Sequence, residues 1–219
     1  MEPDPLSATT PVNVSGRRAS ITRNEILEAT LGLLGPHRSL SSLSLREVAR
    51  ATNMAPNSFY RHFSNMDELA IALIDQAGTA LRGIIGDARR RATPDRNVVR
   101  TSVEIFMEQL RSSPQLLHVL LREGSVGSTA FKQAVERELR FFEDELCSDL
   151  KRLAHIRNTG LFEPELTAKA ITRLVFAMGS IAMDLPKEQY ALLTDQISIM
   201  VRMIIVGSQT MSTAKDNRI

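Results

Sequence analysis

The sequence has one cysteine, no tryptophan and no long uninterrupted apolar run. The single cysteine, Cys147, excludes an internal disulfide and a cysteine-based zinc site. No run approaches the roughly 20 apolar residues that a membrane span needs. The N-terminus also lacks the basic and apolar regions of a secretory signal. With 219 residues, 43% of them hydrophobic, the chain can form one large domain or two unequal ones. We therefore expect a cytoplasmic protein with no membrane partner.

Catalytic signatures are missing as well. The histidines lie far apart and none has a glutamate or cysteine at metal-ligand spacing; they are His37, His62, His118 and His155. There is no Gly-x-Ser-x-Gly elbow and no glycine-rich phosphate loop. Cys147 lies beside Leu146 in an apolar helical stripe, the place of a buried small residue. We expect no enzymatic activity, no metal and no cofactor.

What the chain does have is arginine near its N-terminus. The net charge is only +2, but the segment from Arg17 to Phe63 holds seven arginines against three glutamates, a local charge of +4. A basic face on a small helical unit indicates an anionic partner such as DNA. The alternative is an ordinary solvated helix surface.

Helical periodicity covers most of the remaining sequence, and no alternating strand pattern is long enough to trust. Residues 1–19 are rich in Pro, Ser and Thr and predict a disordered tail. We predict an all-α fold with a three-helix helix-turn-helix domain over residues 20–64. A larger helical body for ligand binding and dimerisation follows over residues 65–211, and residues 212–219 form a second tail. Within the body, one helix is expected from Asn65 to about Arg91, and a loop from Gly124 to Ser128.

The segment SLSLREVARATNMAPNSFYRHF, residues 42–63, has the pattern of a helix-turn-helix. Ala49 is small and lets the second helix cross closely. Asn53 stands where the turn needs a left-handed residue, which asparagine tolerates. Pro56 fits the first turn of the second helix, where its missing N–H is no loss. An ordinary helical corner is the alternative, but such a corner does not require these spacings.

The outer face of this second helix is expected to meet DNA. Its residues are small or hydrogen-bonding, as suits base edges and phosphates in a major groove: Ala55, Pro56, Asn57, Ser58, Tyr60, Arg61 and His62. We predict that Asn57 and Ser58 lie nearest the bases and that Tyr60 and His62 hold phosphates. The DNA-binding set also includes residues expected along the DNA backbone: Arg17, Arg18, Arg23, Ser44, Leu45 and Arg46.

The same stretch resembles the DNA-binding domain of the TetR family of transcriptional repressors. The resemblance covers Ile21 to about Ile74 and includes the aromatic motif FYRHFSNMDEL, from Phe59 to Leu69. Two positions depart from the family pattern. Asn53 stands where glycine is usual, and Met66 stands where a phosphate-contacting lysine is frequent, so one backbone contact is in doubt.

Further segments resemble one branch of that family, the FabR/DesT-type regulators of unsaturated fatty-acid synthesis. They include VVRTSVEIFMEQLRSSPQLLHVLLREGS, TAFKQAVERELRFFEDEL and LVFAMGSIAMDL. This resemblance implies a repressor of fatty-acid desaturation genes that senses the shape of a long-chain acyl-CoA or acyl thioester. The alternative is a TetR-type repressor of an efflux or catabolic operon that responds to another hydrophobic molecule.

An acyl chain needs a long apolar slot, and the body helices offer residues for one. The predicted lining is Phe106, Leu110, Leu117, Leu120, Leu121, Phe131, Phe142, Phe176 and Met178. Singly, each of these suits ordinary core packing as well. If the carrier is coenzyme A, Arg122 or Arg173 is predicted to meet its phosphates at the mouth.

The last two helices are apolar on more than one side, so both sides must be buried. We predict a homodimer through a four-helix interface that sets the two recognition helices about 34 Å apart on a palindromic operator. The predicted contacts are Leu174, Ala177, Met178, Ile181, Ile197, Met200, Val201 and Ile204. One large monomeric core is the alternative. The helix from Asn65 to Arg91 is expected to link ligand and DNA, and Gly78, Gly83 and Gly86 are expected to let it bend or slide at low cost.

Overall fold

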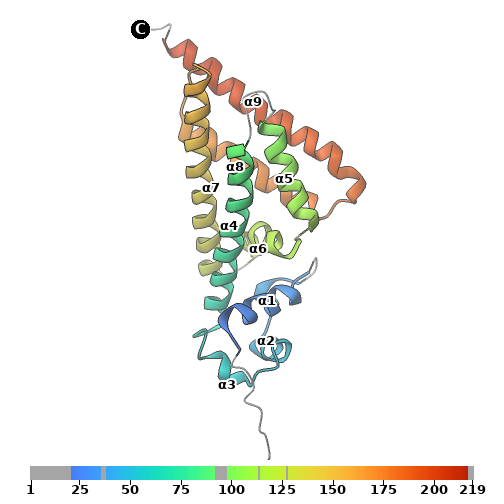
Figure 1. Ribbon diagram of the computed structural model, residues 1–219. Coiled ribbons are helices and arrows are strands. Elements are labelled where there is room, and N and C mark those ends of the chain that lie inside the picture. The colour runs from blue at the N-terminus through green and yellow to red at the C-terminus, as the bar shows by residue number, and fades with distance from the viewer. Residues whose placement is uncertain (1–20, 36–37, 92–97, 113, 127, 217–219) are drawn as a thin grey trace, which may run out of the picture.

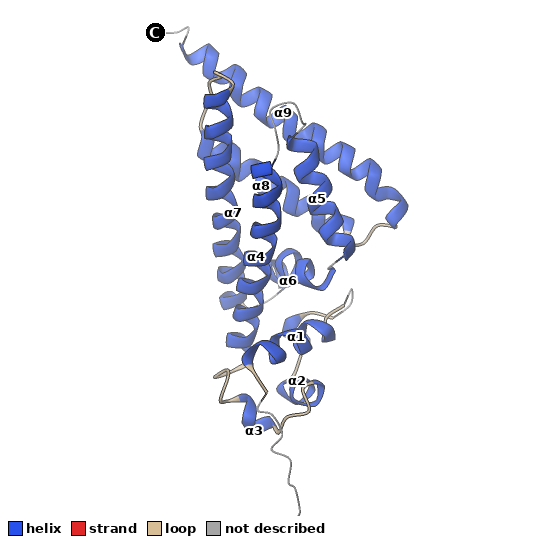
Figure 2. Cartoon of the chain, in the orientation of Figure 1, coloured by secondary structure: helices blue, strands red, loops and turns tan. Residues whose placement is uncertain are grey.

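The fold is all-α, as predicted from the sequence. The computed structural model describes residues 21–35, 38–91, 98–112, 114–126 and 128–216. In these ranges it contains helices and an isolated bridge between Gly35 and Arg38, and no strand (Figure 2). The helices are α1 (Arg23–Leu33), α2 (Leu45–Ala51), α3 (Pro56–Phe59), α4 (Met66–Arg91), α5 (Val98–Ser112), α6 (Pro114–Val126), α7 (Thr129–Ile156), α8 (Pro164–Ala182) and α9 (Tyr190–Asp216), with short 3-10 turns at Leu40–Ser42 and Lys187–Gln189.

The first three helices form a small head at one end of the molecule (Figure 1). Capping boxes decide where α1 and α2 begin. The Thr22 and Ser44 hydroxyls accept from the backbone N–H of Glu25 and Glu47, and each glutamate accepts from the cap residue's own N–H. These hydrogen bonds hold the pKa of both glutamates below the usual value, as expected for a carboxylate at a helix N-terminus.

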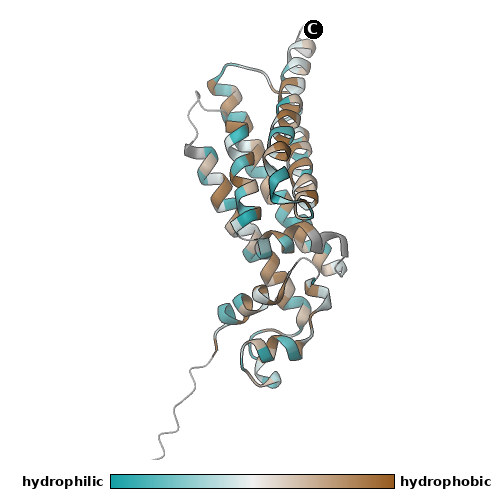
Figure 3. Cartoon of the chain, turned by 90° about the vertical axis from the view of Figure 1, so that its right-hand side faces the viewer, coloured by the Kyte–Doolittle hydropathy of each residue, from teal (hydrophilic) through white to brown (hydrophobic). Residues whose placement is uncertain are grey.

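The larger body consists of α4 to α9 (Figure 1). α7 packs against both α4 and α8, α9 packs against α5 and α8, and α6 lies against α4 and α7. α4 extends from the head into the body, and α1 also contacts α6. In Figure 3 the body helices carry alternating hydrophobic and hydrophilic bands, the pattern of amphipathic helices around a shared core. α4 therefore joins the body to the head.

A series of ion pairs holds α4 against α7. Arg82 of α4 pairs with the buried Glu138 of α7, and its Nε lies 3.5 Å from Glu145. Two turns further along α4, Arg89 pairs with Asp149 at 2.6 Å and approaches Glu145 at 3.6 Å. Glu145 thus lies between the two arginines. These interactions fix the register of the two helices over the part of the body farthest from the head.

Several boundaries differ from those predicted. α3 ends at Phe59, so Tyr60, Arg61 and His62, which were expected on the second helix, form a turn instead. The loop predicted from Gly124 is wrong over its first residues, because α6 continues to Val126. α4 is a continuous helix through Gly78, Gly83 and Gly86.

Two helical stretches, Met66–Arg89 and Lys187–Ala214, have the length and composition of a membrane span. The sequence expectation had excluded any such stretch by counting uninterrupted apolar residues. The most apolar windows of these helices are 50% and 33% buried within the fold. Core helices of soluble proteins pass the same test of length and composition, so the finding is weak support for a membrane role.

Candidate DNA-binding face and ligand cavity

The turn between α2 and α3 has the geometry of a helix-turn-helix. Asn53 has a φ of 51°, the left-handed conformation expected from the sequence. The backbone N–H of Met54 donates to the carbonyl of Ala49 at 2.9 Å, closing the turn. Pro56 stands in the first turn of α3, and Phe59 is fully buried beneath it. The buried side of α3 is thereby fixed, and its other side faces solvent.

That outer side holds the residues predicted to meet DNA. Ala55, Pro56, Asn57 and Arg61 are exposed, whereas Ser58 and His62 are half-buried. Tyr60 is 60% exposed and makes only an edge contact with Phe59, with ring centroids 5.8 Å apart. Its ring is therefore not part of the core.

The predicted backbone contacts have different surroundings. Arg46 is exposed and has no ion pair among the described residues. The Ser44 hydroxyl is engaged in capping α2, and Leu45 is half-buried against the core. Arg23 lies 4.5 Å over the Phe63 ring and 3.6 Å from the Glu68 carboxylate. Arg17 and Arg18 lie outside the described residues.

Arg23 is thus also a structural contact. Its guanidinium joins α1 to the start of α4, where Glu68 accepts from the Ser64 N–H at 2.7 Å. The Ser64 hydrogen bonds and, to a smaller extent, Arg23 hold the pKa of Glu68 below its usual value. Contact with a phosphate would have to compete with this local pairing.

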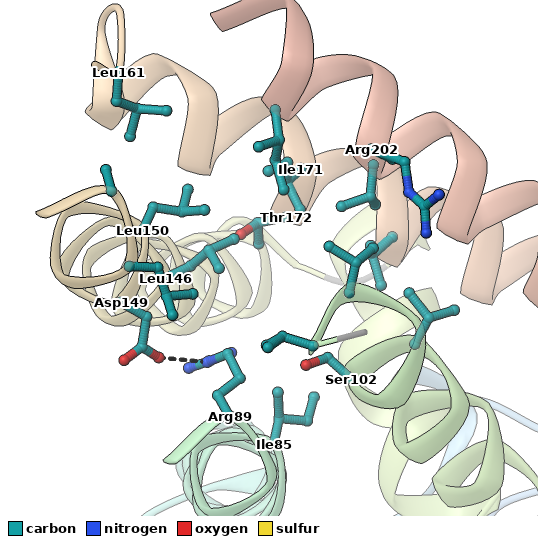
Figure 4. Close-up of a pocket in the computed structure, with 18 of the residues that line it drawn as sticks. Ile85, Arg89, Ser102, Leu146, Asp149, Leu150, Leu161, Ile171, Thr172 and Arg202 are labelled. Carbon is teal, nitrogen blue, oxygen red and sulfur yellow. Dashed lines mark hydrogen bonds and ion pairs between the residues drawn. The ribbon is translucent and has the colours of Figure 1, made fainter. Parts of the chain in front are cut away.

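The body contains a cavity of ≈ 380 Å³ lined by residues of α4, α5, α7, α8 and α9 (Figure 4). This volume is within the range of about 300–1,000 Å³ typical of small-molecule sites. The walls are mainly aliphatic and phenyl side chains, among them Ile85, Leu146, Leu150, Ile171 and Phe176. Such walls suit an apolar ligand.

A few polar groups interrupt these walls. The buried Arg89 donates from Nε to Asp149 at 2.6 Å on one side of the cavity (Figure 4). Ser102 and the buried Thr172 contribute hydroxyls. Toward solvent, the exposed Arg202 of α9 also lines the cavity and makes no ion pair within the described part of the chain. The cavity therefore has apolar length with polar groups at particular places.

Only part of the predicted slot lines this cavity. Phe106, Phe142 and Phe176 do. The other predicted residues pack in or against the core nearer the head, because their helices meet there without a gap: Leu110, Leu117, Leu120, Leu121, Phe131 and Met178. Their positions in this structure are those of ordinary packing residues.

The predicted phosphate contacts also need correction. Arg173 is outside the cavity wall and forms a two-pronged pair with Glu136 at 2.6 and 2.7 Å, with Nε donating to Glu143 at 2.7 Å. The pairing lowers the pKa of Glu136 and raises that of Arg173. An arginine held between two carboxylates binds α8 to α7 and is poorly placed for a ligand. The side chain of Arg122 lies outside the described residues.

Sequence reasoning missed the polar residues of the cavity, although a signal was present. Asp149 stands in the apolar stripe of α7 between Leu146 and Leu150, and Arg89 is one turn after Ile85 on α4. A charge inside an apolar stripe must be paired across an interface or face a cavity. Arg89 and Asp149 pair with each other between α4 and α7, and both also line the cavity.

The outer surfaces of α8 and α9 expose large apolar side chains. They are Leu166, Ile181, Leu192, Ile199, Met203 and Met211, each more than half exposed, together with Val206, which is 51% exposed and also lines the cavity. Of the predicted dimer contacts, Ala177 and Ile181 are exposed, and Leu174, Met178, Met200 and Ile204 are half-buried. Ile197 and Val201 are buried inside their own protomer, and Val201 lines the cavity. These two are wrong as dimer contacts, because they lie on the inner side of α9.

Comparison with known proteins supports the assignment of the head. The profile of the family described as "Bacterial regulatory proteins, tetR family" matches residues 26–73, which extend from α1 into α4. The match contains the helix-turn-helix and the aromatic motif after it. It leaves the cavity and the α8–α9 surface outside its range.

The overall fold is similar to that of solved regulators. The fatty acid degradation regulator FadR from Bacillus halodurans superposes with a TM-score of 0.69 at 16% identity, covering 82% of this chain and 93% of that one. FadR from Bacillus subtilis in complex with stearoyl-CoA gives 0.68 at 14% identity, with coverage of 85% and 99%. AibR in complex with isovaleryl coenzyme A and operator DNA gives 0.61 at 17% identity, with coverage of 84% and 97%.

At these identities the structural likeness establishes the fold alone, and the family profile identifies the head independently. The head presents a helix-turn-helix with its polar face outward, on a body that encloses an apolar cavity. Residues 26–73 thus match the tetR family of bacterial regulatory proteins, and the chain as a whole has the fold of the solved regulators named above.

Proposed function

We propose that this protein is a cytoplasmic repressor that binds a palindromic operator as a homodimer and is controlled by a long-chain acyl-CoA. The observation that carries the ligand proposal is the ≈ 380 Å³ cavity with apolar walls. An acyl chain would lie along α7, whose lining stretch from Phe142 to Arg157 spans about 22 Å at 1.5 Å per residue. That stretch is longer than the ~15 Å that an acyl chain occupies in half a bilayer core.

The polar groups toward solvent suit the carrier of such a chain. Arg157 and Arg202 line the cavity and are exposed, so they replace Arg122 and Arg173 as candidates for contact with coenzyme A phosphates. Two similar folds contain acyl-CoA ligands, stearoyl-CoA in one FadR and isovaleryl coenzyme A in AibR. These ligands support the class of effector. Control of fatty-acid desaturation genes remains the finer proposal from the sequence resemblance.

The homodimer would form through the exposed apolar faces of α8 and α9. Exposed side chains such as Ile181, Ile199 and Met203 cost free energy in water and are the kind of surface that a second copy covers. Pairing two copies through these helices would place both heads on the same side of the dimer. Two heads can then read the two halves of a palindrome.

The experiment is a titration of operator affinity with palmitoyl-CoA and oleoyl-CoA at equal concentrations. The operator is first isolated by selecting bound fragments from random DNA. A change in affinity with either ester supports an acyl-CoA effector, and a difference between them supports sensing of chain shape. Sequence-specific DNA binding with no response to either ester would leave the DNA-binding function and reject the effector.

A second candidate is a regulator that senses a smaller hydrophobic molecule with a polar group, for an efflux or catabolic operon. The observation that favours it is the Arg89–Asp149 pair, with the buried Thr172, in the cavity wall, since these side chains can hydrogen-bond to a polar group of a ligand, which a purely apolar chain does not offer. Arg89→Met distinguishes the candidates. It should weaken a ligand held by this pair and leave the affinity for an acyl chain little changed.

A further inference from the structure

The end of the cavity nearest the head is formed by residues of four helices. Toward the head, the last lining residues are Ile85 of α4, Phe106 of α5, Phe142 of α7 and Phe176 of α8. One turn further on, Leu81, Leu110 and Leu139 are buried in continuous core. Three of the four residues at the boundary are thus phenylalanines from different helices.

The Phe176 ring contacts the rings of Phe142 and Phe106. The Phe176 ring centroid is 5.0 Å from that of Phe142, at an interplanar angle of 61°, and 5.8 Å from that of Phe106. All three side chains are at least 90% buried. Aromatic pairs at these separations are stabilising beyond the area they bury, so the rings form a rigid inner end to the cavity, here called the aromatic floor.

Gly179 determines where one of these rings lies. An ideal Cβ at position 179 would be 2.6 Å from Cζ and 2.7 Å from Cε1 of Phe106. The ring can therefore rest against the α8 backbone only because position 179 has no side chain. Gly179 lies beyond the floor and does not line the cavity. An added methyl group there would push Phe106 toward the ligand space.

We propose that the aromatic floor and Gly179 set the longest acyl chain that this protein binds in full. The inference rests on the proposed acyl-CoA effector and adds the residues that fix its length specificity. Each methylene that finds room in the cavity should tighten binding about fourfold, from the free energy of burying one CH₂ group. Once the chain reaches the aromatic floor, further methylenes should no longer increase the affinity.

The test measures dissociation constants calorimetrically for saturated acyl-CoA esters from octanoyl to eicosanoyl. In the unaltered protein, affinity should rise about fourfold per methylene up to a certain chain length and then stop rising. This chain length is here called the break. Phe106→Leu and Phe176→Leu shorten the rings and should move the break to longer chains. Gly179→Ala should move it to shorter chains.

Matched substitutions control for general loosening of the fold. Phe131→Leu removes a phenyl ring that is equally buried but lies outside the cavity. Gly83→Ala adds a methyl group on α4 where nothing lies within 4 Å. Both controls should leave the break at its original length. Thermal unfolding of every variant identifies any that fails to fold, and the glycine substitution tests the floor independently of the ring substitutions.

A break that stays at the same length in the ring variants and in Gly179→Ala would overturn this inference and leave acyl-CoA binding intact. Failure of the unaltered protein to bind any ester would reject both the effector and the floor. Shifts in opposite directions for the two kinds of variant would support the inference, since neither control can produce them.

Discussion

The carboxylate of Glu138 lies against Gly78, in the space that a side chain at position 78 would occupy. Glu138 belongs to α7 and is 2% exposed, and its carboxylate pairs with Arg82 one turn along α4 from the glycine. The helices approach closely at this point because one of them has no side chain there. The buried charge of Glu138 is balanced at this contact by Arg82, which lies on the same helix as Gly78.

Replacing Gly78 by alanine should destabilise the protein. The new methyl group overlaps the buried carboxylate and separates it from Arg82, and overpacking of this kind costs about 1–3 kcal/mol. Gly83→Ala, on the same helix but with open space around it, should stabilise by up to about 1 kcal/mol through helix propensity. Urea unfolding of both variants measures the difference. Equal effects would mean that α4 and α7 can separate at Gly78 without cost.

Glu138→Gln should change how stability depends on pH. Burial raises the pKa of Glu138 above its usual value, and Asp75 raises it further, while Arg82 and Arg137 act in the opposite direction. A carboxyl with a raised pKa favours the folded state at low pH and loses that contribution as pH rises through the raised pKa. The stability of the unaltered protein relative to Glu138→Gln should therefore fall as pH increases above about 4.5. A flat difference between pH 4 and 8 in urea unfolding would contradict the raised pKa.

Substitutions on the outer face of the head should separate affinity from sequence preference. Arg46→Ala should weaken binding to all DNA sequences alike, because a phosphate contact carries no sequence information. Asn57→Ala should lower the preference for the operator over mismatched sites by about 1–3 kcal/mol. Competition binding at fixed salt checks both.

Since the Tyr60 ring is largely exposed, Tyr60→Ala should keep the helical circular dichroism of the head while losing affinity.

Ile199→Glu should convert the dimer to monomers. Ile199 is 55% exposed on α9, and a carboxylate buried there on pairing would be left without a partner. Ile156→Glu is the control, since Ile156 is 56% exposed but belongs to α7 and not to α8 or α9. Light scattering at micromolar concentration should report monomers for the first variant and dimers for the second. A monomeric unaltered protein would reject the dimer itself.

The sequence predicted the head in detail because its signals are local. Asn53 and Pro56 each specify a backbone conformation through neighbours a few residues away, and the structure contains both conformations. The cavity was predicted only in part. Apolar periodicity identifies Phe106 and Leu117 equally as inward-facing, but one lines a space and the other fills it. That distinction depends on how far apart the helices are, which periodicity does not contain.

The length of α4 has a mechanical consequence. Its 26 residues extend about 38 Å at 1.5 Å per residue, with the cavity at one end and the head at the other. A tilt of about five degrees around the cavity end would carry the other end by about 3 Å, close to the ~3.4 Å between successive bases along a DNA strand. In the proposed dimer, such a tilt of α4 would therefore move each head relative to its half of the operator by about one base pair.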